Sequence, residues 1–191
     1  FGIEINDFAV AVAQTALWIA ELQMLNETAE IIHKNLNPLP LKNFANIFEG
    51  NALRLDWKKI CPTPDFIFGN PPFVGTKYQT LEQKADILNL CKDLKPLDYV
   101  TGWYFKADQF MQNNSVRSAF VSTNSITQGE QVAPLWKNLR SHIDFAQRTF
   151  KWDSESNDKA AVHCVIIGFS IAPNPRECLH KIVCPNGNAT D

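Results

Sequence analysis

The sequence predicts an α/β domain built on a doubly wound, mostly parallel sheet whose final strand is antiparallel. Short apolar runs rich in β-branched and aromatic residues alternate with segments of helical periodicity, which is typical of this fold class. A last apolar run at 160–170 follows a polar turn at 153–158 and predicts an antiparallel partner for the strand before it. With 191 residues, 45% of them hydrophobic, the chain is long enough for one ordinary core.

The first predicted strand covers residues 1–5, and because the chain opens inside it we expect the complete domain to begin further upstream. Asn6 and Asp7 then predict the start of an amphipathic helix from residue 8 to about residue 25. Apolar residues recur there at helical spacing, namely Val10, Ala13, Leu17, Ala20 and Met24. A linker with prolines at 37–40, a short apolar piece at 44–48 and a turn at 49–51 follow.

A short buried strand is predicted at 65–69, and it must end where Pro71 and Pro72 remove backbone donors. The later elements, in order, are helices at 80–92 and 96–112, a strand at 117–122, a helix near 130–140 and a strand at 142–146. In a doubly wound sheet, ligands bind beyond the carboxyl ends of the strands. Functional residues are therefore expected directly after strands.

Composition narrows the class of protein. A formal net charge of -2 and a pI near 6.1 give no general attraction for phosphates, so any binding to DNA must depend on a local group of basic residues. Five cysteines without a CxxC pair indicate free thiols in a reducing cytoplasm, and Cys178, His180 and Cys184 lack a fourth ligand for zinc. No run approaches roughly 20 uncharged apolar residues, so we expect no membrane partner.

Asn70-Pro71-Pro72-Phe73, directly after the predicted strand, is the most informative tetrapeptide. The lone pair of an amine on an aromatic base is conjugated into the ring, which makes the nitrogen a poor nucleophile. The Asn70 side-chain carbonyl and the Pro71 backbone carbonyl are two acceptors that favour a pyramidal nitrogen, ready for a methyl group. Phe73 offers an apolar face for a base rotated out of the duplex. The alternative is a rigid turn whose Phe73 fills the core.

Two further pairs lie at or just after the ends of predicted strands. Glu4, with Ile5 beside it, is an acidic residue at the end of an apolar strand, where it can accept hydrogen bonds from both hydroxyls of a ribose. Its alternative role is to cap the helix that follows. Asn51 and Ala52 come after the next strand and are candidates to contact a cofactor adenine, while an ordinary turn explains Asn51 nearly as well.

The chain resembles the gamma-type N6-adenine DNA methyltransferases, and in particular the MmeI-like restriction-modification enzymes of type IIL/IIG. The resemblance covers most of the chain. It is carried by residues 2–5 (GIEI), 69–75 (GNPPFVG), 78–79 (YQ), 82–86 (EQKAD), 97–100 (LDYV), 119–131 (AFVSTNSITQGEQ), 148–152 (RTFKW) and 159–169 (KAAVHCVIIGF).

The resemblance implies a class I, Rossmann-like fold that transfers a methyl group from S-adenosyl-L-methionine to the N6 amino group of a flipped-out adenine in double-stranded DNA. It implies that Glu4 binds the cofactor ribose, that Asn51 stands where an acidic residue often meets the cofactor adenine, and that Asn70 to Phe73 form the catalytic loop. It also implies that Phe150 stacks on the base opposite Phe73, the alternative being a core phenylalanine. A bacterial source is expected, and no metal.

The chain departs from the family pattern at its start, where the first strand and the glycine-rich loop that holds the cofactor are missing. We therefore expect residues 1–172 to be an incomplete catalytic core and 173–191 an extension toward a recognition domain. Nuclease and target-recognition domains are the expected partners in the full-length chain. Alone, the chain is expected to bind cofactor weakly or not at all, and an unpaired sheet edge gives it a route to self-association.

Two questions stay open at this level. The Asn-Pro-Pro-aromatic loop also serves enzymes that methylate release-factor glutamine or guanine in ribosomal RNA, and a non-catalytic packing module has the same pattern. Four basic residues near the expected site, Lys77, Lys84, Arg148 and Lys151, are candidates for DNA phosphate contacts. Their alternative is an ordinary solvated surface.

Overall fold

The computed structural model describes residues 1–34, 46–91, 97–152, 162–172 and 178–180. The chain divides into two compact units, Phe1–Pro62 and Thr63–Asp191. Both combine helices with parallel strand pairing, as the alternating sequence pattern predicts.

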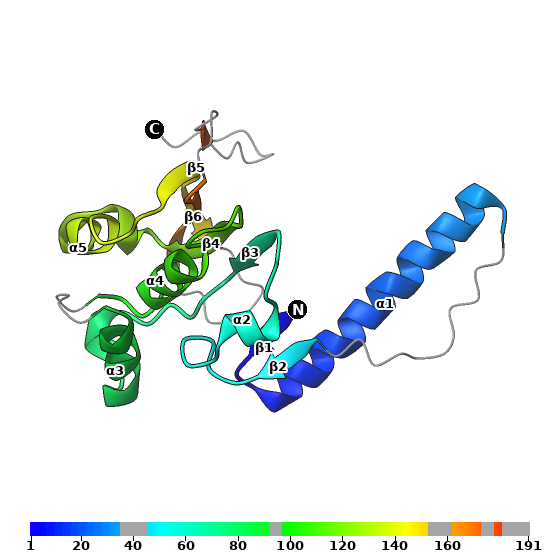
Figure 1. Ribbon diagram of the computed structural model, residues 1–191, viewed down its shortest axis with the longest axis horizontal. Helices are drawn as coiled ribbons and strands as arrows, with labels where there is room; N and C mark the ends of the chain where they lie inside the picture. Colours follow the sequence, from blue (N-terminus) through cyan, green and yellow to red (C-terminus); the bar gives the residue numbers. More distant parts are fainter. Residues whose placement is uncertain (35–45, 92–96, 153–161, 173–177, 181–191) are drawn as a thin grey trace. The chain divides into compact units, whose positions relative to one another are not determined.

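The first unit contains two short parallel strands, β1 (Gly2–Glu4) and β2 (Ile47–Glu49), with α1 (Asp7–Ile32) and α2 (Trp57–Ile60) (Figure 1). Glu4 is level with Glu49 in the register, so both strands end at the same edge. The backbone N–H of Gly50 donates to the Glu4 carbonyl at 2.8 Å, which continues the ladder by one bond. Glu4 therefore ends β1 and residues 50–52 follow β2, at the carboxyl ends of neighbouring strands, as expected.

The long helix α1 begins where the sequence predicts, because the Asn6 side chain accepts a hydrogen bond from the Ala9 N–H at 2.9 Å. It runs seven residues further than expected, to Ile32. The expected amphipathic character is wrong: none of its side chains is buried, and exposed apolar residues such as Phe8, Leu17 and Ile19 point in several directions. By length and composition alone α1 is able to cross a membrane, although it carries Glu21, Glu27 and Glu30.

The second unit is built on a five-stranded sheet in the order β3-β4-β6-β5-β7 (Figure 1). Its strands are β3 (Phe66–Gly69), β4 (Arg117–Thr123), β5 (His142–Trp152), β6 (Val162–Ser170) and β7 (Cys178–His180). β3 and β4 are parallel, and β6 runs antiparallel to both β4 and β5. The predicted antiparallel final hairpin is thus confirmed, and β7 adds a parallel pairing with β5.

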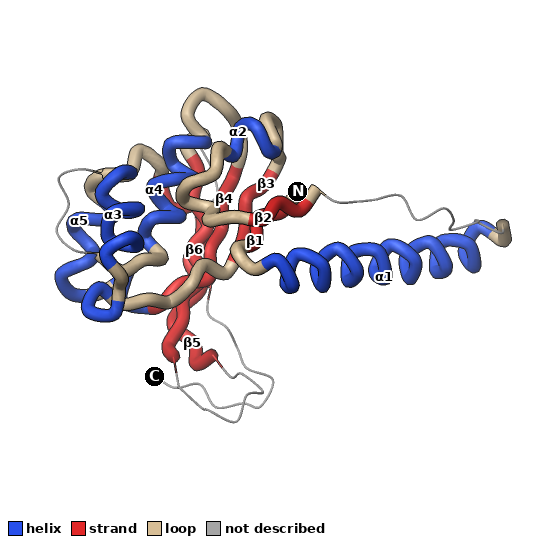
Figure 2. Tube along the Cα trace, turned by 90° about the horizontal axis from the view of Figure 1, so that it is seen from below, coloured by secondary structure: helices blue, strands red, loops and turns tan. Residues whose placement is uncertain are grey.

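Helices α3 (Leu81–Leu90), α4 (Thr101–Phe110) and α5 (Val132–Trp136) lie along one side of this sheet (Figure 2). The core between them centres on Tyr104, whose ring stacks on Phe169 at 5.0 Å and meets Phe120 and Trp136 edge-on. The Tyr104 hydroxyl is paired with the Ser122 hydroxyl at 2.8 Å, which satisfies both buried groups. Burial raises the pKa of Tyr104 far above its usual range, so it stays protonated.

The strand β3 forms where predicted, but its expected burial is wrong. Phe66 and Phe68 are 67% and 82% exposed and lie two residues apart, on the same face of the strand. β3 is the edge strand of the described sheet, because only β4 pairs with it. A short apolar run does not distinguish a central strand from an edge strand, since that difference depends on neighbours distant in the sequence.

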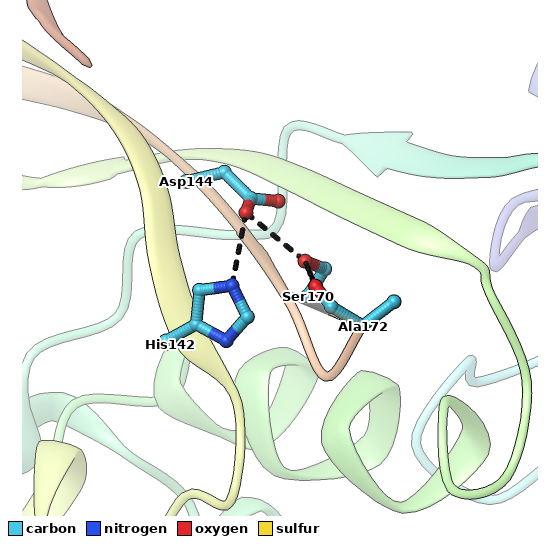
Figure 3. Close-up of polar contacts among 4 residues, drawn as sticks. All are labelled: His142, Asp144, Ser170 and Ala172. Atoms are coloured by element: carbon cyan, nitrogen blue, oxygen red, sulfur yellow. Dashed lines mark hydrogen bonds and ion pairs between the residues drawn. The ribbon is translucent and has the colours of Figure 1, made fainter. Parts of the chain in front are cut away.

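His142, Asp144, Ser170 and Ala172 form a polar cluster at the start of β5 and the end of β6 (Figure 3). The Ser170 hydroxyl lies 3.0 Å from Asp144 Oδ1, and His142 Nε2 lies 3.3 Å from the same oxygen. Ser170 is level with Arg117 at the amino end of β4, six residues from Thr123 at its carboxyl end, or roughly 20 Å at the rise of a strand. The cluster therefore fixes the hairpin and lies far from the edge where ligands are expected.

Gly168 in β6 has no room for a side chain, because a Cβ there would lie inside the ring of Phe145 on β5. We expect Gly168→Ala to lower the free energy of unfolding by about 3 kcal/mol through this overlap. Gly69→Ala is the matched control, since a Cβ at Gly69 would meet Phe120 at an ordinary 3.9 Å. Urea unfolding of the two variants checks the prediction, and equal stability would contradict the packing described here.

Candidate functional site

The tetrapeptide Asn70 to Phe73 leaves the sheet at the carboxyl end of β3, as predicted. Pro71 is buried and Phe73 is half-buried, while Asn70 and Pro72 are exposed. Pro72 O accepts a hydrogen bond from the Val74 N–H at 3.1 Å, which closes the loop on itself. The side chain of Asn70 therefore faces solvent from a backbone that Pro71 anchors in the core.

The downstream half of this loop is tied to the segment that begins α4. The Val74 carbonyl accepts from the Tyr99 N–H at 2.9 Å, and the buried Gln79 side chain donates to the Leu97 carbonyl at 2.7 Å. The backbone between these anchors forms the short helix η1 (Thr76–Tyr78). The segment from Val74 to Gln79 is thus held at both ends by contacts between residues 25 and 18 positions apart in the sequence.

Asp98 connects the catalytic-loop segment to the turn after β4. Its Oδ1 accepts from the Thr76 N–H at 2.9 Å and from the Thr76 hydroxyl at 3.0 Å, and its Oδ2 accepts from the Ser125 hydroxyl at 2.7 Å. The Asp98 N–H donates to Gln131 Oε1 at 3.0 Å. Ser125 lies in η2 (Asn124–Thr127), directly after the carboxyl end of β4. One buried carboxylate therefore organises three segments at the same edge of the sheet.

Burial alone raises the pKa of Asp98, but hydrogen bonds from Ser125, Gln131 and Thr76 outweigh it and hold the pKa below its usual value. Because this pKa is lower in the folded than in the unfolded state, ionised Asp98 stabilises the fold at every pH above the ordinary aspartate pKa, about 4. The contribution is lost as the pH falls below that value and the folded protein becomes protonated at Asp98. We expect the difference in unfolding free energy between wild type and Asp98→Asn to stay constant from about pH 5 to 8 and to shrink below about pH 4. Urea unfolding across pH measures it, and a difference that grows toward acid pH would contradict the assignment.

Phe150 and Phe73 come to the same edge of the sheet. Phe150 on β5 is level with Cys164, which in turn is level with Thr123 at the carboxyl end of β4. β3 and β5 are separated by β4 and β6, a span of roughly 14 Å at normal strand spacing. Phe150 is half-buried, so part of its ring is accessible. Phe73 lies four residues beyond Gly69 at the carboxyl end of β3, so both aromatic residues lie toward the carboxyl ends of the parallel strands.

Glu4 is half-buried at the end of β1, and its Oε1 accepts hydrogen bonds from the Ile5 N–H at 2.9 Å and the Asn6 N–H at 3.1 Å. The cap of α1 is Asn6 and not Glu4. Glu4 binds only the backbone N–H groups of the two residues that precede the helix. These bonds fix the carboxylate through one oxygen. Among the described residues the other oxygen, Oε2, has no hydrogen-bond partner, so it is left as an acceptor.

Asn51 and Ala52 form a tight turn after β2. Asn51 Oδ1 accepts from the Leu53 N–H at 2.9 Å, and the Ala52 carbonyl accepts from the ring N–H of the buried Trp57 at 2.8 Å. The Asn51 carbonyl also accepts from Arg54 and Leu55. The structure therefore shows Asn51 in the turn role that the sequence left open. A cofactor contact would have to be made by the side-chain NH2 group of Asn51 while Oδ1 keeps its bond to Leu53.

The four basic candidates are all exposed. Lys77 lies in η1 and Lys84 in α3, whereas Arg148 and Lys151 lie on β5 on either side of Phe150. All four therefore belong to the second unit, and Lys151 is level with His163 near the edge that carries Phe150. In the described parts of the chain, no group of three or more His, Cys, Asp or Glu side chains has the arrangement of a metal site.

The sequence did not single out Asp98, Gln79 or Ser125 as residues of the site. Their roles depend on hydrogen bonds between positions 18 to 27 residues apart, which no local pattern shows. A signal was present, since Asp98 is an acidic residue between apolar neighbours in Leu97-Asp98-Tyr99-Val100. A charged group in such a run must be paired if it is buried.

Comparison with known proteins shows the family of the chain. Residues 1–181 match the family described as "MmeI, DNA-methyltransferase domain". "DNA methyltransferase A" of Bacillus subtilis (strain 168) is 42% identical over 180 residues, which cover 88% of this chain and 20% of that protein. The chain thus spans about a fifth of the length of this curated relative.

Solved structures give the same result. A structure of the type IIL restriction-modification enzyme MmeI in complex with DNA superposes with a TM-score of 0.90 and 44% identity, covering 98% of this chain and 26% of that one. A modification subunit of a putative type I restriction enzyme from Vibrio vulnificus YJ016 has a TM-score of 0.52 at 16% identity, covering 74% and 30% of the two chains. The second likeness concerns the fold alone.

Proposed function

The chain belongs to the MmeI DNA-methyltransferase domain family, and we propose that it transfers a methyl group from S-adenosyl-L-methionine to the N6 amino group of a flipped-out adenine in DNA, within a restriction-modification enzyme. Its fold is an α/β methyltransferase fold. The observation that carries the proposal is the exposed Asn70 side chain at the carboxyl end of β3, on a loop fixed by buried Pro71.

The chemistry follows from the acceptors that this loop presents. Asn70 Oδ1 and the Pro71 carbonyl would each accept a hydrogen from the N6 amine, which favours a nitrogen whose lone pair points away from the ring. With S-adenosyl-L-methionine bound, this nitrogen would accept the methyl group while the cofactor leaves as a neutral thioether, and the N6 proton that is lost would pass from the two acceptors to solvent water. No covalent bond to the protein is needed, so the loop acts by orientation. Anchoring through Val74 and Gln79 keeps that orientation fixed.

The residues of the first unit fit the cofactor unequally. Glu4 presents a carboxylate held by backbone N–H groups, with Oε2 as the acceptor for a ribose hydroxyl, and Ile5 follows it as an exposed apolar neighbour. Asn51 Oδ1 and the Ala52 carbonyl already accept hydrogen bonds within their own turn, so we propose that these two residues contribute less to cofactor affinity than Glu4 does. When bound, S-adenosyl-L-methionine supplies the methyl group as an electrophile.

Phe73 and Phe150 are proposed to stack on the two faces of the extruded adenine and to replace stacking lost from the duplex. Base-aromatic stacking contributes about 1 to 3 kcal/mol per base, which is comparable to the cost of flipping. Lys77, Lys84, Arg148 and Lys151 are proposed to contact phosphates. Four exposed basic residues supply a local attraction that the net charge of -2 does not.

The remaining assignments concern the full-length chain. We propose that its nuclease and target-recognition domains lie outside residues 1–172, that 173–191 lead toward the recognition domain, and that the protein works in the bacterial cytoplasm on double-stranded DNA. The described edges of β1 and β3 are each paired on one side only. We propose that the cofactor binds more weakly to this part of the chain alone than to the full-length protein, and that the open edge of β3 gives it a route to self-association.

The experiment that tests this function supplies the full-length parent with methyl-labelled S-adenosylmethionine and three acceptors in parallel, namely mixed-sequence duplex DNA, ribosomal RNA and a release factor. Label in DNA alone is the expected result. Label in either of the other acceptors would move the activity to another planar amine. Cofactor binding without transfer to any of the three would indicate a non-catalytic packing module.

A further inference from the structure

Tyr78 and Leu81, immediately downstream of the catalytic loop, are 84% and 86% exposed. Tyr78 is the last residue of η1, and Leu81 is the first residue of α3. Single exposed apolar side chains are common on protein surfaces, so exposure alone has no functional meaning. The backbone beneath this pair, however, is held more firmly than an ordinary surface turn.

Hydrogen bonds fix the turn on both sides of Tyr78. Before it, Thr76 donates through its N–H and its hydroxyl to the buried Asp98 carboxylate. At Tyr78 itself the N–H donates to the Gly75 carbonyl at 2.8 Å, and a Cβ on Gly75 would lie 3.8 Å from the Tyr78 ring. The ring is therefore close to the Gly75 backbone.

After Tyr78, the buried Gln79 side chain anchors the chain to the Leu97 carbonyl. Thr80 and Gln83 then form a reciprocal capping box that starts α3 and sets the direction of Leu81. Because these contacts are already made, presenting the two side chains to a partner costs little further conformational entropy. A tyrosine presented on a rigid backbone is typical of the residues that contribute most to binding.

The chemistry around the pair favours a nucleic acid as the partner. Tyr78 follows Phe73 by five residues on the braced loop, so it lies beside the loop proposed to receive the base. Lys77 and Lys84 are exposed on either side of the pair in the sequence, while the exposed acid Glu82 lies between them. An apolar tip flanked by lysines suits stacked bases with phosphates on both sides.

We propose that Tyr78, with Leu81 beside it, contacts the base stack of the duplex next to the extruded adenine and fills part of the gap that the adenine leaves. This inference rests on the proposed function, because the gap exists only if a base is flipped. An inserted side chain replaces stacking that flipping removes, and thereby stabilises the flipped state. Tyr78 is a positioning residue in this account, since it does not touch the reacting atoms.

The test uses the full-length parent and a duplex with one adenine that the wild-type parent is first shown to methylate. The variants are Tyr78→Ala, the conservative Tyr78→Phe, and Ile143→Ala as a control. Ile143 is 38% exposed and lies on β5 level with Phe169, toward the amino end of β4 and away from the catalytic edge. Each is assayed on the paired duplex and on the same duplex with an abasic site opposite the target adenine, which removes the pairing that flipping must break.

On the paired duplex we expect Tyr78→Ala to lower the methylation rate about tenfold or more, and Tyr78→Phe and Ile143→Ala to stay within about twofold of wild type. On the abasic duplex the Tyr78→Ala defect is expected to narrow to about threefold or less, because the adenine no longer needs help to leave the stack. That rescue supports the proposal, since a purely structural defect would persist on both duplexes.

An unchanged rate for Tyr78→Ala on the paired duplex would overturn the proposal. An equal loss of rate for Tyr78→Ala on both duplexes would also overturn it. So would a Tyr78→Ala protein with a lowered melting temperature and wild-type affinity for DNA, because Tyr78 would then be packed against another part of the full-length chain. Failure of the proposed function is distinguished at the first step, because the wild-type parent would then methylate no adenine in any duplex.

Discussion

Replacing Asn70 with alanine is expected to lower the rate of methyl transfer to DNA by about 100- to 1,000-fold, the usual cost of removing one positioned hydrogen-bond partner of a transition state. Asn70 Oδ1 is one of the two acceptors proposed for the adenine amine, and the Pro71 carbonyl that remains cannot orient the lone pair alone. Because the Asn70 side chain is exposed, its removal opens no cavity and should leave folding unchanged. Single-turnover transfer from labelled S-adenosylmethionine measures the effect.

Asn89→Ala is the matched control for this variant. Asn89 is also an exposed asparagine, but it lies in the last turn of α3, away from the loop. Its loss is expected to leave the transfer rate within about twofold of wild type, as for most exposed positions remote from a site. If Asn70→Ala transfers methyl groups as fast as Asn89→Ala does, Asn70 does not hold the acceptor amine.

Replacing Asp98 with alanine is expected to give the second large effect, lowering both stability and transfer. Asp98 accepts two hydrogen bonds from Thr76 and one from Ser125, so its loss leaves three part-buried donors without their acceptor, at a cost of about 3 kcal/mol. The same contacts brace the segment after the catalytic loop. We therefore expect transfer to fall at least about tenfold even well below the melting temperature, mainly through kcat.

Asp98→Asn keeps the volume of the side chain and removes its charge, so it distinguishes the effect of the charged hydrogen bonds from that of packing. The asparagine has the same shape and keeps one carbonyl oxygen for Thr76, while the Ser125 hydroxyl can turn to accept from the new amide. About half of the lost stability and transfer should return, as expected when neutral hydrogen bonds replace bonds to a charged acceptor. Melting curves and kcat measured together test this, and an Asp98→Ala parent with wild-type kcat would show that the carboxylate serves packing alone.

Local signals in the sequence were sufficient for much of the fold. Asn6 marks the start of α1, and Pro71 and Pro72 mark the end of β3, because a cap and a missing donor act within a few residues. The polar turn and the continuous apolar run after it predicted the hairpin of β5 and β6. These elements depend on interactions that the chain makes with its near neighbours.

Features that depend on distant partners were missed. β5 extends to Trp152 instead of ending near 146, because register shifts between Gln147 and Phe150 let it continue past an irregular segment alongside β6. The helix expected at 130–140 is reduced to α5 at Val132–Trp136, with a positive φ of 64° at Gly129 just before it. The exposure of Phe66 and Phe68 likewise follows from which strands adjoin β3.

The candidate site divides in the same way. The sequence placed Asn70 to Phe73 after a strand and Glu4 at the end of one, and the structure has them there, because strand ends and their following residues are local features. The acidic Asp98 among apolar neighbours signalled that it must be paired if buried, but not that its partners would be Thr76 and Ser125, since that network assembles only when three segments meet. It also left the role of Asn51 open, and the bond from Leu53 N–H to Asn51 Oδ1 shows a turn there.

The most direct test of the central claim is the chemical identity of the methylated nucleoside. DNA treated with the full-length parent and S-adenosylmethionine would be digested to nucleosides and analysed by mass spectrometry, beside DNA treated with the Asn70→Ala parent. The account predicts N6-methyldeoxyadenosine with the wild type and its loss with Asn70→Ala. Methylated cytosine in place of methylated adenine, or methylated adenine undiminished by Asn70→Ala, would contradict it.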